Sequence, residues 1–461
     1  MALKQIFAFI PEVKKPEEKK VDFRTKLKWT LIVLGAFFIL YNIPLHGLSA
    51  NALDRFKFLA TILGTDFGSV ISLGIGPIVM SSIILQLLVG SGILSIDTKT
   101  PEGKKYFQGI QKLGVIFFIF FEAVVYVLMQ GLQAAPGFTG IVIFQLILGG
   151  FAIMFMDEVS NKWGFGSGVS MFILAGVALQ LFTGLFQFTD PTGANCLVNF
   201  GQGQCTGQIL VILQSIINGD VQQLFLAVTI ILVTILVFLG VVWAQSLKVE
   251  IPLSYDRLRG YGVKWPLAFF YASVIPVILV SALIANLQLF GGLLENWLGR
   301  PTFLGSFSNG VPVSGLAYWL GSSNLVEAFI RGSVTTPQIF QGITHLLFYM
   351  VFSAVFSVFW VKTAGMDASS QAKNIMSSGL QIPGFRKDQR ILESILSRYI
   401  MPLTVMGGLA VGALAAVANS FGALTSGTAI LLAVMISYQF YQNIAQQHAV
   451  DMHPAMRKFI G

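Results

Sequence analysis

Charged residues are scarce in this 461-residue chain: Asp, Glu, Lys and Arg together make up 11% of it, whereas 55% of its residues are apolar. Soluble globular domains usually carry about 25% charged residues, so the composition excludes an ordinary soluble domain. Apolar stretches of about 17 to 25 residues, long enough to cross a bilayer as a helix, recur along the whole sequence. They predict an all-α polytopic membrane protein.

Ten stretches have the length and composition of membrane spans. Gly and Pro occur inside several of them, as membrane helices allow. The expected spans are Leu27–Leu45, an interrupted segment that ends near Ile93, Leu113–Leu132, Thr139–Met156, Val169–Phe188, Leu224–Leu247, Trp265–Phe290, Gln338–Val361, Pro402–Phe421 and Thr428–Ala445.

Histidine and cysteine are also rare, with four and two residues respectively. The histidines are not spaced with carboxylates or cysteines as a metal site requires. We therefore expect no metal, no cofactor and no enzymatic activity. Cys196 and Cys205 both fall in an expected external loop, where a structural disulfide and two free thiols are both open.

Ionisable residues are few inside the expected spans. Glu122 is the only acid clearly within one, and His345 is the only deeply placed basic candidate. A secondary transporter normally needs such groups near mid-membrane to bind its substrate and driving ion. This scarcity weighs against a solute transporter built on inverted repeats, which is the alternative that the interrupted span would also allow; an intramembrane enzyme is a weaker one. Glu122 itself fits either a hydrogen bond that joins two helices or a functional role.

Positive charge is concentrated on one side of the expected bundle. If the N terminus is cytoplasmic, all but four of the 29 Lys and Arg residues fall in cytoplasmic segments. This asymmetry predicts that both termini are cytoplasmic. Two basic loops, 248–264 and 362–398, fit either a lipid-attracted surface or a docking surface for an anionic partner such as a ribosome, because clustered arginines bind phosphates. Their candidate contact residues are Arg257, Arg259, Arg386 and Lys387.

One expected span is interrupted. Within residues 54–92 a short apolar run gives way to a break at 64–68 and a Gly- and Pro-containing hinge at 74–77. Only Ile75–Val89 remains as an unbroken apolar helix, roughly 22 Å long and so shorter than the ~30 Å hydrocarbon core. A helix that starts partway across a membrane needs protein or water around its backbone groups, which points to a cavity or pore.

A short internal sequence repeat favours a division of the chain into two halves. The second expected span contains IGPIV followed by LQLLVG, and the seventh contains IPVI followed by LQLFGG. Each is the second span of a group of five, and the predicted topology makes the two run in opposite directions, as inverted repeats require. The expected division is a cytoplasmic segment 1–26, a first half 27–188, an external loop 189–223, a second half 224–445 and a cytoplasmic tail 446–461.

Seven motifs follow one another along essentially the whole chain: LGIGPIVMSSIILQLLVGSG, PEGKKYFQGIQK, DEVSNKWGFGSGVSMFILAG, KVEIPL, IPVILVSALIANLQL, GFRK and RYIMPLTV. They resemble the SecY family in its archaeal form, the protein-conducting channels of the Sec translocon. The resemblance implies ten transmembrane helices in two pseudo-symmetric inverted halves of five, arranged as a clamshell around a central pore. It also implies a passive pore for secretory polypeptides in the cell membrane, driven by a partner.

The resemblance assigns a role to three sets of residues. A ring of aliphatic side chains closes the pore of the family midway, as an apolar constriction that excludes water would; the matching positions are Ile75, Val79, Val169, Ile173, Ile278 and Leu432. The family's plug, a short helix outside that ring, matches about 54–68, including Asp54, Arg55, Phe56, Lys57, Asp66, Phe67 and Gly68. The lateral gate between spans two and seven, which releases apolar segments into lipid, matches Met80, Ser81, Ser82, Gln86, Glu122 and Asn286.

One gate position departs from the family pattern. Met80 stands where relatives place a polar residue that completes a cluster with Glu122 and Asn286, and Ser81 or Ser82 could replace it only if the helix face were shifted. The implied partners are small SecE-type and Secβ-type membrane subunits, a ribosome that contacts the basic loops, the nascent polypeptide with its signal sequence, and membrane lipids.

Overall fold

The computed structural model describes residues 11–17, 21–51, 53, 63–96, 100–189, 195–196, 205–255, 262–272, 274–308, 311–377, 380–381 and 388–452. Its helices are α2 (Phe23–Tyr41), α4 (Gly76–Gly90), α5 (Pro101–Leu128), α6 (Thr139–Trp163), α7 (Gly168–Phe186), α8 (Gln208–Asn218), α9 (Val221–Ser246), α10 (Ile275–Leu298), α11 (Gly315–Leu320), α12 (Leu325–Ile330), α13 (Thr336–Thr363), α14 (Ala368–Ser377), α15 (Gln389–Ser420) and α16 (Gly427–Met452). Short strands form three small antiparallel sheets: β1 (Leu48–Asn51) with β2 (Leu132–Ala134), β5 (Ser306–Ser308) with β6 (Val311–Ser314), and β3 (Lys248–Tyr255) between β4 (Gly262–Ala268) and β7 (Leu380–Gln381).

Polar residues mark where several long apolar helices begin. The Thr100 hydroxyl accepts a hydrogen bond from the Gly103 N–H at the start of α5. Asp220 caps α9 in the same way through Gln223 N–H, and Thr335 forms a capping box with Gln338 before α13. Because the first N–H groups of a helix have no partner within it, these residues set the start points locally.

Each of the ten expected spans overlaps a helix: α2, α4, α5, α6, α7, α9, α10, α13, α15 and α16. Among the described residues, seven helices are long and apolar enough to cross a membrane by length and composition, namely α5, α6, α7, α9, α10, α13 and α15. Helix α4 has only 15 residues, as the interruption in the sequence predicts. The helices are thus consistent with ten spans.

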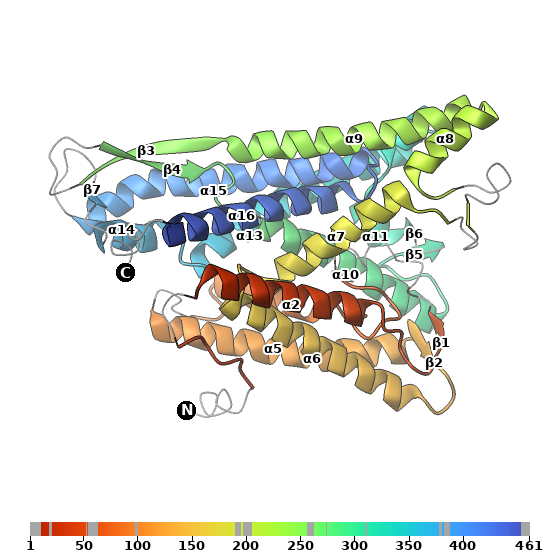
Figure 1. The fold of residues 1–461 in the computed structure, drawn as a ribbon, viewed down its shortest axis with the longest axis horizontal. Helices are drawn as coiled ribbons and strands as arrows, with labels where there is room; N and C mark the ends of the chain where they lie inside the picture. The colour runs from red at the N-terminus through yellow and green to blue at the C-terminus, as the bar shows by residue number, and fades with distance from the viewer. Residues whose placement is uncertain are drawn as a thin grey trace.

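The helices lie in two groups along a common long axis (Figure 1). Helices α2, α5 and α6 form one side, α9, α15 and α16 form the other, and α7, α10 and α13 run between them. The β3–β4 hairpin and α14 lie at the end of the molecule where α2 begins and α16 ends, whereas β1–β2 and β5–β6 lie at the opposite end. The short helix α4 contacts α5, α10 and α13, and α7 contacts α6 and α16.

The seventh expected span begins at Trp265, which is earlier than the start of the helix that the structure shows there. Residues 262–268 form β4 instead, paired with β3 in the register Ile251 opposite Trp265, and α10 begins at Ile275 and runs on to Leu298. In the hairpin Leu267 and Ile251 are buried against α14 and α15, while Lys264 and Pro266 are exposed. The apolar residues before Ile275 therefore pack in a separate small core with α14 and α15. Local hydrophobicity alone does not reveal whether such residues form a strand or the start of a membrane helix.

The second basic loop is also more structured than expected. Its residues include α14, β7 and the first turns of α15, which begins at Gln389 rather than at Pro402. The helix passes through Pro402, whose missing N–H leaves the carbonyl of Arg398 without a helical partner. Arg398 itself is exposed. The expected external loop contains a helix as well, α8.

Candidate functional site

The six aliphatic positions predicted to form the ring lie in one buried apolar cluster, which we call the collar. They come from four helices: Ile75 at the cap of α4 and Val79 within it, Val169 and Ile173 of α7, Ile278 of α10 and Leu432 of α16. The same cluster also contains residues of α2, α9, α13 and α15. Five of the six are at most 5% exposed, and Val169 is partly buried against the same cluster. The fold therefore brings together, between the two halves, side chains that are up to 357 residues apart in sequence.

Helix α4 starts inside the protein because the preceding chain supplies its backbone partners. The N–H of Ile75, the cap residue of α4, donates to the Leu63 carbonyl at 2.8 Å. Gly74 has φ +53°, and a Cβ there would come within 2.3 Å of the Leu63 oxygen, so only glycine fits this left-handed turn. The break at 64–68 and the hinge at 74–77 thus form one compact structure that begins a helix partway along the bundle.

Hydroxyl groups complete the hydrogen bonding of this interrupted segment. Thr65 Oγ1 donates to the Ile71 carbonyl, and the Ser72 hydroxyl accepts from the Gly68 N–H at 2.9 Å. Ser69 Oγ donates to the Asp66 carbonyl at 2.7 Å. Because a lipid environment offers no partners for backbone groups, such internal satisfaction is what an interrupted helix at this depth requires.

The end of the expected plug packs against the collar helices. Leu63 and Phe67 are buried, and a Cβ on Gly64 would lie 3.3 Å from Phe172, the neighbour of Ile173. Asn51 Nδ2 donates to the Phe67 carbonyl at 2.7 Å, and Leu45 N–H donates to that of Gly68 at 2.8 Å. Asp66 is partly buried. The other expected plug residues, Asp54, Arg55, Phe56 and Lys57, lie outside the described residues.

Two serines expected at the gate point to α5 instead of α10. Ser81 Oγ donates to the Gln111 carbonyl at 2.7 Å, and the Gln111 amide donates to Ser82 Oγ at 2.7 Å. Ser81 also lies against Gly114, where a Cβ would come within 2.3 Å of its hydroxyl. These serines join α4 to its neighbour in the same half, so they do not replace the polar group that Met80 lacks. Met80 packs against the collar cluster.

Glu122 and Asn286 are both buried where α4, α5 and α10 meet. Gly76 at the start of α4 borders Glu122, because a Cβ there would lie 2.9 Å from Glu122 Oε2. Asn286 Nδ2 donates to the Ala282 carbonyl of its own helix at 2.8 Å. Among the described residues, neither carboxylate oxygen of Glu122 has a hydrogen-bond partner, and the same holds for Asn286 Oδ1 and Gln86 Oε1. Helices α4, α5 and α10 thus carry buried polar oxygens that no donor in the described part of the chain satisfies.

The residues flanking Glu122 and Asn286 confirm that α5 and α10 meet at this level. Ala123 of α5 and Ala285 of α10 belong to one buried cluster. The rings of Phe121 and Phe290 lie 6.4 Å apart on the same two helices. A small residue at Gly76 leaves room for the carboxylate at the start of α4.

The expected contact residues of the basic loops, Arg257, Arg259, Arg386 and Lys387, lie outside the described residues. What the structure describes is the segments that flank them in sequence, which form the β4–β3–β7 sheet and α14. Lys264 pairs with Glu250 across β4 and β3 at 2.7 Å, and this hydrogen bond raises the pKa of the exposed lysine. The sheet stands at one end of the molecule (Figure 1).

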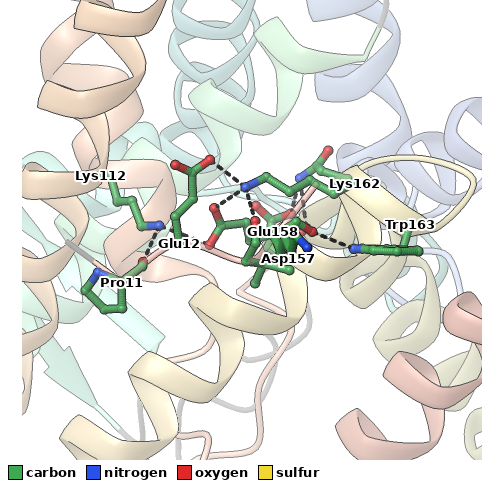
Figure 2. Close-up of polar contacts among 10 residues, drawn as sticks. Pro11, Glu12, Lys112, Asp157, Glu158, Lys162 and Trp163 are labelled. Carbon is green, nitrogen blue, oxygen red and sulfur yellow. Dashed lines mark hydrogen bonds and ion pairs between the residues drawn. The ribbon is translucent and has the colours of Figure 1, made fainter. Parts of the chain in front are cut away.

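A group of ion pairs holds the amino-terminal segment to the bundle (Figure 2). The sequence alone did not predict it. We call Glu12, Lys112, Glu158 and Lys162 the clasp. Glu158 bridges both lysines, at 3.0 Å from Lys112 and 2.9 Å from Lys162, and Lys162 reaches Glu12 at 2.6 Å. The hydrogen bond from Lys162 lowers the pKa of the Glu12 carboxyl. The i, i+4 spacing of Glu158 and Lys162 was the only sequence signal for it.

The clasp also binds the main chain of the same segment. Lys112 Nζ donates to the Pro11 carbonyl and Lys162 Nζ to that of Val13, each at 2.6 Å. The Trp163 indole N–H donates to the Lys14 carbonyl at 2.9 Å (Figure 2). Since Lys112 follows Gln111, the partner of Ser81 and Ser82, these contacts join the amino-terminal segment, α6, α5 and α4 into one connected body.

At the opposite end Cys196 and Cys205 are joined in a disulfide, with their Cα atoms 5.6 Å apart. Both side chains are buried with Leu210 of α8. The bond ties the chain before α8 to a small apolar cluster and lies away from the collar.

Comparison with known proteins gives one family. The family described as SecY matches residues 69–441. The protein translocase subunit SecY of Methanothermobacter thermautotrophicus is 44% identical over 99% of this chain and 98% of its own. A solved structure concerned with the plug domain of SecY, which stabilises the closed state of the translocation channel and maintains a membrane seal, has a TM-score of 0.82 at 38% identity and covers 98% of this chain and 99% of its own. Sec61 in the canine ribosome-channel complex has a TM-score of 0.79 at 38% identity, with the same coverage.

Proposed function

The chain belongs to the SecY family, and from that premise we propose that it is the protein-conducting channel subunit of a translocase in the cell membrane. It moves secretory polypeptides across the membrane and releases transmembrane segments sideways into lipid. The observation that carries this proposal is the collar: six aliphatic side chains from both halves belong to one buried apolar cluster that includes the start of the short helix α4. A solute transporter is not favoured, because it would need ionisable groups near mid-membrane to bind its substrate and driving ion, whereas the six collar residues are aliphatic.

The collar acts as the seal of the resting pore. A narrow aliphatic constriction expels water and so blocks ions, yet its side chains can move aside around a passing polypeptide of any sequence. Each collar residue is held by a helix of one half, so separating the halves opens the constriction. Conduction is passive and non-enzymatic, and the energy comes from a partner.

Residues 54–68 act as the plug on the external side of the collar. Support comes from Gly64, where a Cβ would lie 3.3 Å from Phe172, and from the solved SecY structure whose plug domain maintains a membrane seal. Charged residues suit an element that leaves for water when the channel opens. Asp54, Arg55, Lys57 and Asp66 supply them.

Helices α4 and α10 form the lateral gate. A signal sequence or apolar segment enters between them and gains lipid contact that water cannot offer. The buried oxygens of Glu122 and Asn286, unsatisfied by the described residues, make this boundary weaker than a fully apolar one. Within the first half, Ser81 and Ser82 hold α4 to α5, so α4 moves with its half.

The complete channel includes SecE-type and Secβ-type subunits and receives its polypeptide from a ribosome. Sec61, at 38% identity, occurs in a ribosome-channel complex, and Arg257, Arg259, Arg386 and Lys387 offer phosphate-binding chemistry in the two basic loops. Both termini face the cytoplasm, on the same side as these loops. The excess of Lys and Arg on that side supports this orientation.

Photo-crosslinking tests the proposed pathway. A ribosome-stalled nascent chain is offered to the reconstituted channel with a photo-reactive residue at Val79 or Ile278, and both positions should label the chain. A matched probe at Phe238, an exposed residue of α9 that faces away from the collar, should not. Proton- or sodium-coupled uptake of a small solute, without labelling at Val79 or Ile278, would contradict the proposal.

A further inference from the structure

The two helices that complete the halves, α7 and α16, begin with the same local sequence. Ser167-Gly168 precedes the collar residue Ile173 at the same spacing as Ser426-Gly427 precedes Leu432. Each Gly is the first residue of its helix. The two helices correspond to the fifth span of each half, so the match is the kind that an inverted repeat produces.

The first turn of each helix is capped by the helix before it. Asp157 of α6 accepts the Val169 N–H on Oδ1 at 2.9 Å, and Asn419 of α15 accepts the Thr428 N–H on Oδ1 at 2.7 Å. Val169 and Thr428 each lie four residues, one helical turn, before Ile173 or Leu432. Both acceptors therefore act one turn from a collar side chain.

Glycine permits the same close approach at both places. A Cβ on Gly168 would lie 2.5 Å from Asp157 Cα, and one on Gly427 would lie 2.0 Å from the Ala418 carbonyl carbon. Backbone cannot move aside as a flexible side chain can, so each helix start is seated against the end of the preceding helix.

Each acceptor is itself held in place. Asn161 donates to Asp157 Oδ1 at 3.0 Å. The amide of Asn419 lies 3.2 Å from His345 Nε2, while His345 Nδ1 lies 2.7 Å from the Leu320 carbonyl. One arrangement satisfies every group: His345 donates from Nδ1, accepts on Nε2 from Asn419, and Asn419 accepts from Thr428.

We propose that Asp157 and Asn419 are a matched pair of positioning residues that set the height of α7 and α16, so that Ile173 and Leu432 meet the collar at the same level. The inference rests on the proposed sealing role of the collar. The first N–H groups of a helix have no internal partner, and a one-residue shift moves a side chain by about 1.5 Å. A fixed acceptor on the neighbouring helix therefore sets the register of the seal. His345 acts only through Asn419.

Ion leak through the resting channel tests the pair. Asp157→Ala and Asn419→Ala remove the acceptor, whereas Asp157→Asn keeps an oxygen in place. His345→Gln keeps a donor and an acceptor, and His345→Leu removes both. Ser353→Ala is the control, because Ser353 is fully buried and its hydroxyl has no hydrogen-bond partner among the described residues. Loss of one buried hydrogen bond changes an equilibrium by roughly fivefold to tenfold.

We expect the leak conductance of purified complexes in planar bilayers to rise by about that factor for the alanine and leucine variants. It should stay at the original level for Asp157→Asn, His345→Gln and Ser353→Ala. The inference is overturned if the folded alanine and leucine variants seal as the original chain does, or if Ser353→Ala leaks equally. Should an alanine variant fail to fold, the His345 pair tests the Asn419 cap, and Asn161→Ala, which removes the donor to Asp157 Oδ1, tests the Asp157 cap.

The same assay separates this inference from the proposed function. Leu432→Ser places a hydroxyl directly in the collar and should leak whatever the role of the caps. If it seals, the proposed function of the collar fails, and the positioning role fails with it. If it leaks while the cap variants seal, only the positioning role is lost.

Discussion

Replacing Ile278 with serine tests the collar most directly. Ile278 lies in the first turn of α10, is 5% exposed and belongs to the same cluster as Ile75, Val79 and Leu432. Burying an isoleucine side chain stabilises the closed arrangement by about 2 kcal/mol relative to a water-lined one. Losing that contribution should lower the ratio of closed to open channel about 30-fold. The serine hydroxyl also attracts water into the constriction, which acts in the same direction.

The assay is ion conductance across a planar bilayer that contains the purified channel complex without a translocating chain. Ile278→Val is the matched control, because it keeps an aliphatic surface and loses one methylene, and we expect only a small rise in leak. Ile75→Ser should act like Ile278→Ser from the opposite half. A folded Ile278→Ser channel that leaks no more than the valine variant would refute the reasoning, since the burial of Ile278 would then not contribute to the seal.

Three further predictions concern the gate, the clasp and the basic loops. Glu122→Gln should change how apolar a signal sequence must be to open the gate, measured by translocation of a graded series of signal sequences; an unchanged threshold would leave Glu122 a purely structural role. Because the hydrogen bond from Lys162 lowers the pKa of Glu12, the ion pair should hold the amino-terminal segment to the bundle above about pH 4.5, the ordinary range of a glutamate, and release it as the pH falls through the lowered pKa. Hydrogen exchange at residues 11–17, corrected for the intrinsic effect of pH, should therefore be more protected above that pH than below the lowered pKa, and Lys162→Met should abolish the difference. Equal protection above and below would contradict this prediction. Replacing Arg257, Arg259 and Arg386 together with alanine should weaken ribosome binding at physiological salt. An unchanged affinity would count against their role.

The interrupted segment shows how much of the site local sequence can predict. Glycines and a proline at 64–77 predicted a break followed by a short helix, and α4 has 15 residues. These signals work because Gly and Pro restrict or free the backbone of their own residues, so their effect does not depend on distant partners. Hydrophobic length located the other helices for the same reason, while their ends differed where a cap or a proline decided them.

Polar contacts between helices were not predictable in the same way. Ser81 and Ser82 lie next to Met80, and nothing in their spacing says whether they face α5 or α10; the structure turns them towards Gln111. In the clasp Lys162 binds Glu12, which is 150 residues away in sequence. Asn419 lies against His345, which is 74 residues away. Such pairs depend on which helices are neighbours, and one sequence without relatives contains no record of that.

The sequence alone determined that this is a membrane protein of helical spans, that one span is broken, and where the positive charge lies, because hydrophobic length, backbone restriction and net charge are properties of short segments. The resemblance of its motifs added the kind of cargo and the six collar positions. Only the tertiary structure decided that residues 262–268 pair as a strand, that the collar side chains share one buried cluster, and that α7 and α16 start on acceptors from neighbouring helices. Those outcomes depend on close packing of distant segments: a Cβ at Gly74, Gly168 or Gly427 would come within 2.3, 2.5 or 2.0 Å of backbone atoms, so the arrangement is possible only with glycine there.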